Sequence, residues 1–263
     1  MPKITAHALY EGTFSVGTDY KFNKIQKNDS PSKGALKLSI NPFLIKDGKR
    51  NILFDAGLGD LFGNATTIET ILNNLESHSV SDYEISDIFI SHLHFDHMGG
   101  LAHQSNGYWE LTFPDARLWI SENGWKKLHK TLDRISDHEK DFVNFIDTWA
   151  DIHFLSGNSN PIENITVKSI GGHTEFHQAI FYSKGESKYL MAGDVIGRRI
   201  SINRNFAAKY DFDPKKSMKA REDLKNIAWK EDYTIMAYHE TDYPLFKLVD
   251  YDEKQGYTVK KLS

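Results

Sequence analysis

The 263-residue chain contains no cysteine and no apolar run of the length that a membrane helix needs. Without cysteine it forms no disulfide, uses no thiolate nucleophile and offers no sulfur ligand to zinc or to an iron–sulfur cluster. Any metal must therefore be held by imidazole and carboxylate groups. The first residues also lack the apolar core of a signal peptide, and a membrane span takes about 20 apolar residues. We therefore expect a cytoplasmic protein without membrane contact.

An excess of positive charge is missing as well. The chain has 32 Lys and Arg residues against 36 Asp and Glu residues, a formal net charge of −4. Proteins that bind nucleic acid present clustered basic residues, because neutralising phosphates releases counterions. No such stripe occurs here, so nucleic acid is not the expected partner. Hydrophobic residues make up 40% of the chain and charged residues 26%, the balance of a folded globular protein.

Short β-type runs separated by turn residues recur along the chain, and helical spacing occurs between several of them. The expected strands are LKLSINPFLI (36–45), NILFDAG (51–57), DIFISH (87–92), ARLWIS (116–121), ITVKSI (165–170), QAIFYS (178–183), KYLMAGD (188–194) and YTIMAYH (233–239). Helices are expected at 68–75, 125–132, 141–149 and 214–229, where Pro214 suits a first helical turn.

Two polar stretches, 26–34 and 156–161, are expected to be loops. After the second one the chain resumes a strand-rich pattern. Because candidate functional residues occur on both sides of it, we interpret this loop as the connection between two halves of one domain covering residues 1–263.

The segment DIFISHLHFDHMGGL concentrates four candidate ligands directly after an apolar strand. His92, His94, Asp96 and His97 fall within six residues and precede two glycines. If the strand continued, His92 and His94 would share a face, while a turn would bring Asp96 and His97 toward the same point. Imidazole and carboxylate groups suit zinc, iron, manganese or cobalt, and four ligands suffice for parts of two adjacent sites.

Three further strands end in candidate ligands. SIGGHTEFH provides His173 and His177, YLMAGD provides Asp194, and IMAYH provides His239. The other six histidines have no such context, and we expect them to be ordinary exposed or hydrogen-bonded residues: His7, His78, His103, His129, His138 and His153.

The ordered series His92-Leu-His94-Phe-Asp96-His97, His173, Asp194 and His239 resembles the metallo-β-lactamase superfamily over nearly the whole chain. This resemblance implies an α/β fold in which two similar halves form a four-layer αββα sandwich. It also implies two divalent metal ions, for which we expect zinc, with manganese, iron or cobalt as alternatives.

Residue by residue, the resemblance assigns ligands to each metal and a supporting role to two more residues. The first metal takes His92, His94 and His173, the second takes Asp96, His97 and His239, and Asp194 bridges them. Asp55 in LFDAGLGD and His177 match supporting residues that orient the ligands. One departure is that the superfamily's common His-Thr-Pro-Gly-His is His173-Thr-Glu-Phe-His177 here, which preserves the ligand spacing but changes the loop.

Such a centre predicts hydrolysis of a small molecule. Two ions share a water, lower its pKa and present it as hydroxide to an electrophilic carbon or phosphorus. Asp96 and Asp194, as ligands, would position this hydroxide. The proton donor to the leaving group is not identified, and Tyr210, Tyr238 and Tyr243 are candidates only because they are near ligand or loop segments.

The substrate class depends on a second, less specific resemblance. INPFLIKDGKRNILFDAGLGD, FPDARLWISENGW and YDFDPKKSMKAREDL are similar to the branch with N-acyl-homoserine lactonases and organophosphate hydrolases, which favours a lactone or ester. Aryl phosphotriester hydrolysis and thioester cleavage of the glyoxalase II type are alternatives. Nuclease activity and non-catalytic metal binding are less favoured, the latter because all seven ligands are retained.

Two structural points stay open at this level. The polar stretch 17–34 contains Tyr20 and Phe22 and would suit a loop that covers the active site. The resembling branch often forms homodimers, although no apolar stripe in this sequence requires one.

Overall fold

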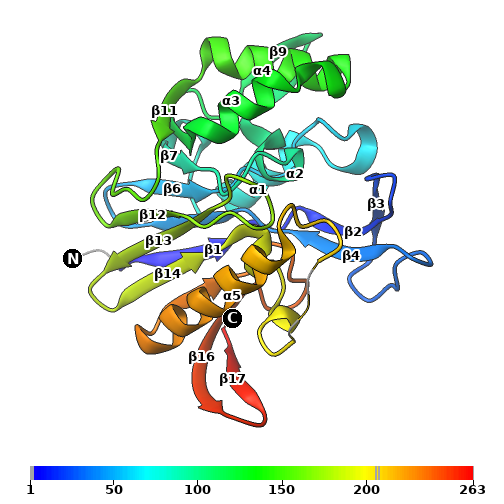
Figure 1. Cartoon of the computed structure of the whole chain (residues 1–263). Coiled ribbons are helices and arrows are strands. Elements are labelled where there is room, and N and C mark those ends of the chain that lie inside the picture. The colour runs from blue at the N-terminus through cyan, green and yellow to red at the C-terminus, as the bar shows by residue number, and fades with distance from the viewer. Residues whose placement is uncertain (1–2, 205, 207, 263) are drawn as a thin grey trace. The chain divides into compact units, whose positions relative to one another are not determined.

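The computed structural model describes residues 3–204, 206 and 208–262 as a mixed α/β fold (Figure 1). The chain divides into two compact units, residues 1–154 and 155–263. Each unit has its own six-stranded sheet and its own helices, and each is described separately below. The division lies next to the polar loop 156–161 that the sequence indicated as a connection.

The main sheet of the first unit has the strand order β1-β5-β6-β7-β10-β11. Strand β6 lies parallel to β7, and β7 lies parallel to β10, so their carboxyl ends meet at one edge. The strands are β1 (Thr5–Ala8), β5 (Phe43–Lys46), β6 (Asn51–Phe54), β7 (Ile85–Phe89), β10 (Arg117–Ser121) and β11 (Asp151–Leu155).

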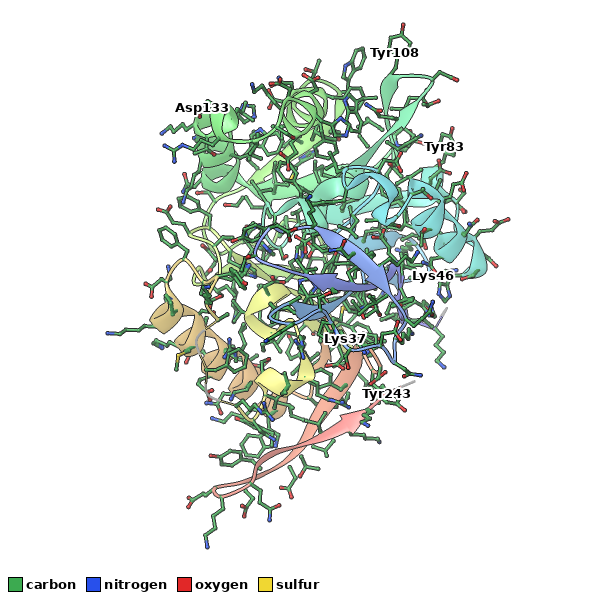
Figure 2. All side chains as sticks on the ribbon, turned by 90° about the vertical axis from the view of Figure 1, so that its right-hand side faces the viewer. Lys37, Lys46, Tyr83, Tyr108, Asp133 and Tyr243 are labelled. Atoms are coloured by element: carbon green, nitrogen blue, oxygen red, sulfur yellow. The ribbon has the colours of Figure 1, made fainter. Side chains whose placement is uncertain are left out.

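Two smaller sheets complete the strands of this unit. Strands β2 (Gly12–Val16), β3 (Phe22–Ile25) and β4 (Leu36–Ile40) form a sheet in the order β3-β2-β4, and β8 (Ala102–Ser105) pairs with β9 (Tyr108–Leu111). Figure 2 shows Tyr108 projecting outward from the β8–β9 hairpin, in agreement with its 77% exposure. The run expected at 36–45 is thus two strands, because the chain breaks at Asn41-Pro42, where proline cannot donate to a ladder.

Among its described residues, the first unit has four α-helices: α1 (Ile68–Ser77), the short α2 (Phe95–Met98), α3 (Glu122–Lys130) and α4 (Asp137–Trp149). The apolar stripe of α1 and that of α4 join the buried core with residues of β7 and β10. Ser136 begins α4 with a capping box, since its hydroxyl accepts the N–H of Glu139 and its own N–H donates to the Glu139 carboxylate.

The second unit packs one long helix against a six-stranded sheet. The sheet has the order β12-β13-β14-β15-β16-β17, in which only β14 and β15 pair in parallel within the described residues. Its strands are β12 (Ile165–Ser169), β13 (Gln178–Lys184), β14 (Ser187–Met191), β15 (Thr234–Met236), β16 (Leu245–Asp252) and β17 (Gly256–Lys261).

Helix α5 (Pro214–Lys230) starts with Pro214 in its first turn, as the sequence predicted, and Asp213 caps it by accepting the N–H of Lys216. Leu224 and Ala228 of α5 share a buried core with Ile235 and Phe246. No helix among the described residues is both long enough and apolar enough to cross a membrane.

Candidate metal centre

In the first unit, the four clustered candidate ligands follow strand β7. The chain leaves β7 at Phe89, runs through Ser91 and His92, and then forms the single turn α2. Nε2 of His92 lies 3.0 Å from Nδ1 of His94, and Nε2 of His97 lies 3.6 Å from a carboxylate oxygen of Asp96. The rings of His92 and His97 are 4.1 Å apart between centroids. The expected convergence of these four side chains is therefore present.

Asp55 fixes the orientation of His97. Its carboxylate is fully buried and lies 2.6 Å from Nδ1 of His97. The same carboxylate accepts the N–H of Ser91 at 2.7 Å and the Ser91 hydroxyl at 2.8 Å. Because a carboxylate only accepts, Nδ1 of His97 carries the proton and Nε2 carries the lone pair that binds a metal. Burial raises the pKa of Asp55, whereas the bonds from His97 and Ser91 act in the opposite direction.

Asp55 occupies an unusual backbone conformation at the end of β6. Its φ angle is +57°, in the left-handed region that Asp and Asn tolerate better than other side chains. Its N–H donates to Phe89 O on the neighbouring strand β7, and the next N–H, that of Ala56, donates to His97 O. This turn therefore directs the carboxylate toward the segment that follows β7.

In the second unit, two candidate histidine ligands flank the carboxylate of a third candidate, Asp194. Asp194 lies just after β14, His239 just after β15, and His173 between β12 and β13. One oxygen of Asp194 is 3.2 Å from Nε2 of His173, and the other is 3.0 Å from Nε2 of His239. Since β14 and β15 are parallel neighbours, their carboxyl ends place Asp194 and His239 at the same edge of the sheet.

Asp211 is a site residue that the sequence analysis missed. Its buried carboxylate lies 2.9 Å from Nδ1 of His173, and so plays for His173 the part that Asp55 plays for His97. Two backbone bonds hold the two loop segments together, because Phe212 N donates to His173 O and Asp213 N donates to Gly172 O. Asp211 follows no strand, and no local pattern marks it.

His177 contacts the backbone that leads to Asp194. Its buried ring donates from Nε2 to Ala192 O at 2.9 Å, two residues before Asp194. Its ring and that of His173 are 5.6 Å apart and nearly perpendicular. The supporting position expected for His177 thus has a physical basis within the second unit.

The donor atoms fit divalent metal ions. With Nδ1 of His173 protonated toward Asp211, its Nε2 presents a lone pair to a carboxylate oxygen 3.2 Å away, which is repulsive for a neutral ring. A cation among these atoms reverses that repulsion. The same argument holds for Nε2 of His97 near Asp96. Imidazole nitrogens and carboxylate oxygens in such groups are the ligands of zinc and related ions.

The remaining histidines and the tyrosines lie in other surroundings. Tyr238 is buried and packs edge-on against His239, whereas Tyr243 is exposed and lies beneath Lys261. Phe22 packs edge-on against Phe14 and at a tilt against Phe62, whereas Tyr20 is exposed; that the stretch 17–34 covers the active site stays a prediction. The six histidines outside the motifs have separate neighbours: His7 with His78, His103 with Thr112, His129 with Asp147, His138 with Trp109, and His153 with Asp151.

A family model described as the metallo-beta-lactamase superfamily matches residues 36–239, a stretch that contains all seven candidate ligands. No curated protein sequence matches the chain.

Several solved structures share its fold over nearly full length. A probable metal-dependent hydrolase from Staphylococcus aureus has a TM-score of 0.75 at 20% identity, covering 99% of this chain and 98% of that one. The hydrolase AbOPH of the beta lactamase superfamily has a TM-score of 0.76 at 22% sequence identity. AidC, a dizinc quorum-quenching lactonase, has a TM-score of 0.76 at 19% sequence identity. Each of these two covers 100% of this chain and 96% of its own. The mixed α/β metallo-β-lactamase fold predicted from the sequence is confirmed.

Proposed function

The chain belongs to the metallo-β-lactamase superfamily and is a hydrolytic enzyme, and we propose that it is a dinuclear metal-dependent hydrolase of lactones or related small esters. In this proposal residues 1–263 act as one domain, in which His92, His94 and His173 hold one ion and Asp96, His97 and His239 hold the other. Asp194 would be a ligand to both ions.

The observation that carries the proposal is the position of Asp194 between two imidazoles. Both of its oxygens face an Nε2 atom, at 3.2 Å for His173 and 3.0 Å for His239, as a bridging carboxylate requires. That the family model runs continuously from 36 to 239 supports the assignment of both ligand sets to one centre. The description of AidC as a dizinc enzyme supports zinc as the metal.

Bound metal ions of this kind polarise the scissile carbonyl group and supply an activated water as the nucleophile. The protein's own residues hold and orient the ligands. Asp55 keeps a proton on Nδ1 of His97, and Asp211 does the same for His173, so both imidazoles present Nε2. Such partners also make the imidazoles more basic and thus better ligands.

The lactone assignment is supported by the solved structures. AidC was solved with a product of lactone opening, and another similar structure is an N-acyl homoserine lactone hydrolase with N-hexanoyl-L-homoserine at its catalytic metal centre. The latter has 19% identity and a TM-score of 0.64, and covers 90% of this chain and 93% of its own. These proteins share the fold, and we extend their substrate class to this chain as a hypothesis.

The test is acid release, followed by pH-stat, from protein loaded with zinc, manganese or cobalt. The panel comprises acyl-homoserine lactones, simple lactones, aryl esters, thioesters and an aryl phosphotriester. We expect lactone opening that is abolished by a chelator and by His239→Ala. Turnover of the phosphotriester or thioester alone would refute the lactone assignment, and failure to bind two metal ions would refute the dinuclear centre.

A further inference from the structure

The carboxyl group of Glu11 is buried in the first unit and makes few hydrogen bonds. It directly precedes β2, and its side chain is 2% exposed. Its Oε2 atom accepts the N–H of Leu58 at 2.9 Å, and Oε1 has no hydrogen-bond partner among the described residues. Burial raises the pKa of Glu11 to about 8, against smaller opposite effects of the Leu58 N–H and of Lys24. A neutral carboxyl group therefore tolerates this environment better than a carboxylate.

The carboxyl group of Glu11 lies directly against the backbone of Gly57. A Cβ atom at position 57 would lie 2.2 Å from Oε1 and 2.5 Å from Cδ of Glu11. Gly57 also has a φ of +83°, in the left-handed region. The two residues thus fit together only because position 57 has no side chain, and Glu11 supports the loop 55–59 from one side.

On its other side, the loop 55–59 packs against the segment that carries His97. Ala56 N donates to His97 O at 2.7 Å, and Gly100 N donates to Gly57 O at 3.1 Å. A Cβ on Gly99 would lie 2.2 Å from Leu58 O, and one on Gly100 would lie 2.1 Å from Ala56 O. Because the backbones touch without intervening side chains, a shift of the loop is transmitted to His97 and to its bond with Asp55.

We propose that Glu11 is a positioning residue for the metal ligand His97: it holds the loop 55–59 through Leu58 and Gly57, and so keeps Asp55 on Nδ1 of His97. The inference rests on the proposed function, because it takes His97 as a metal ligand. An apolar residue of similar size would fill the same volume but would leave Leu58 N without an acceptor, which allows the loop to move.

The experiment compares Glu11→Gln, Glu11→Met and the control Asp47→Asn. Glutamine is neutral and keeps a hydrogen-bond acceptor for Leu58 N. Methionine has a similar side-chain volume but provides no such acceptor. Asp47 is another buried carboxyl group of the first unit, which accepts Lys49 N and Arg50 N in the turn between β5 and β6 and has no part in the loop 55–59.

The first measurement uses metal-free protein and proton NMR. A hydrogen bond of 2.6 Å from His97 to Asp55 gives a low-field imidazole N–H signal, assigned by its loss in His97→Gln. We expect wild type, Glu11→Gln and Asp47→Asn to retain this signal, and Glu11→Met to lose or shift it. An unchanged signal in Glu11→Met, or an equal change in Asp47→Asn, would overturn the proposal.

The second measurement is zinc affinity, determined by competition with a chromophoric chelator. We expect Glu11→Met to bind one of two ions about 10-fold to 100-fold more weakly and the other normally, as is usual for loss of a group that orients a ligand. Equal weakening of both ions, or none, would contradict the role. If wild type binds no zinc, the proposed function fails, while the NMR signal still decides the position of His97. If Glu11→Met does not fold, Glu11→Asp carries the same expectations, since it withdraws the carboxyl group from Leu58.

Discussion

Asp211 accepts a hydrogen bond from Nδ1 of His173 across 2.9 Å, although the two residues are 38 positions apart along the chain. Its second oxygen accepts the N–H of Ala208 at 3.3 Å, so the carboxylate is itself held in place. His97 has the corresponding bond from Nδ1 to Asp55. Each unit therefore supplies a buried aspartate that orients one candidate metal ligand.

We predict that Asp211→Ala weakens zinc binding about 10-fold to 100-fold, because His173 loses the acceptor that fixes its tautomer. The matched control is Asp213→Asn, two residues away, where asparagine caps α5 as well as aspartate does. Chelator competition measures the affinity, and circular dichroism checks the fold. Equal losses in both variants would mean that the segment, and not the Asp211 carboxylate, is responsible.

Asp55→Asn tests the partner of His97 without disturbing the backbone. Asparagine tolerates the φ of +57°, but its amide group places a donor where His97 needs an acceptor. We predict weaker binding of one zinc ion and loss of most hydrolytic turnover. The control is Asp232→Asn, which makes the same exchange at a similar φ of +59°. The Asp232 side chain is exposed and paired with Lys247, so this variant should change neither zinc binding nor hydrolytic turnover.

Sequence patterns indicated the local features of the candidate site and missed the remote ones. One short motif contains His92, His94, Asp96 and His97. Helix α5 begins at Pro214, as predicted, because proline restricts its own φ angle to a value that suits a first helical turn. Asp211 escaped notice because its role depends on a contact with a residue far along the chain. Glu11 escaped for the same reason, since nothing near it in the sequence indicates that its carboxyl group meets Gly57.

Some missed strands did carry a local signal. The hairpin of β8 and β9 turns at Asn106-Gly107, both with positive φ, and Asn-Gly between two short runs is a strong indicator of a tight hairpin. Its strands have four residues each, and β8 is largely polar, so no long apolar run marks the hairpin. The assignment of residues 1–263 to one domain remains a prediction.

Glu11 also predicts a pH dependence of stability. Its pKa is about 8 in the folded chain against an ordinary value of 4.5, so between these values the folded state binds more protons than the unfolded state. The stability it provides is complete below pH 4.5 and is lost as the pH rises toward 8, by up to about 1.4 kcal/mol per pH unit.

We therefore expect the unfolding free energy of metal-free wild type to fall relative to Glu11→Gln as the pH is raised from 5 to 8. Urea unfolding of both proteins at several pH values measures this difference, and groups common to both cancel. A difference that is constant with pH would show that Glu11 titrates normally in the folded protein.

The closeness of Glu11 and Gly57 predicts a large effect of Gly57→Ala. The new methyl group would meet Oε1 of Glu11 at 2.2 Å, in addition to the strain of a φ of +83°. We expect the unfolding free energy to fall by about 3 kcal/mol or more, as backbone strain and overpacking add. Gly34→Ala is the matched control, because Gly34 has a φ of +81° and open space around it, and should show the strain alone.

A double-mutant cycle then isolates the contact itself. In the double variant Glu11→Ala/Gly57→Ala, the methyl group at position 57 has room because the Glu11 carboxyl group is gone. The loss of unfolding free energy in the double variant should therefore be smaller than the sum of the two single losses, by about 1–3 kcal/mol. Urea unfolding of the four metal-free proteins gives this coupling energy. Strict additivity, or a loss in Gly57→Ala no larger than in Gly34→Ala, would show that the Glu11 carboxyl group does not press on Gly57 and would remove the basis for its influence on the loop 55–59.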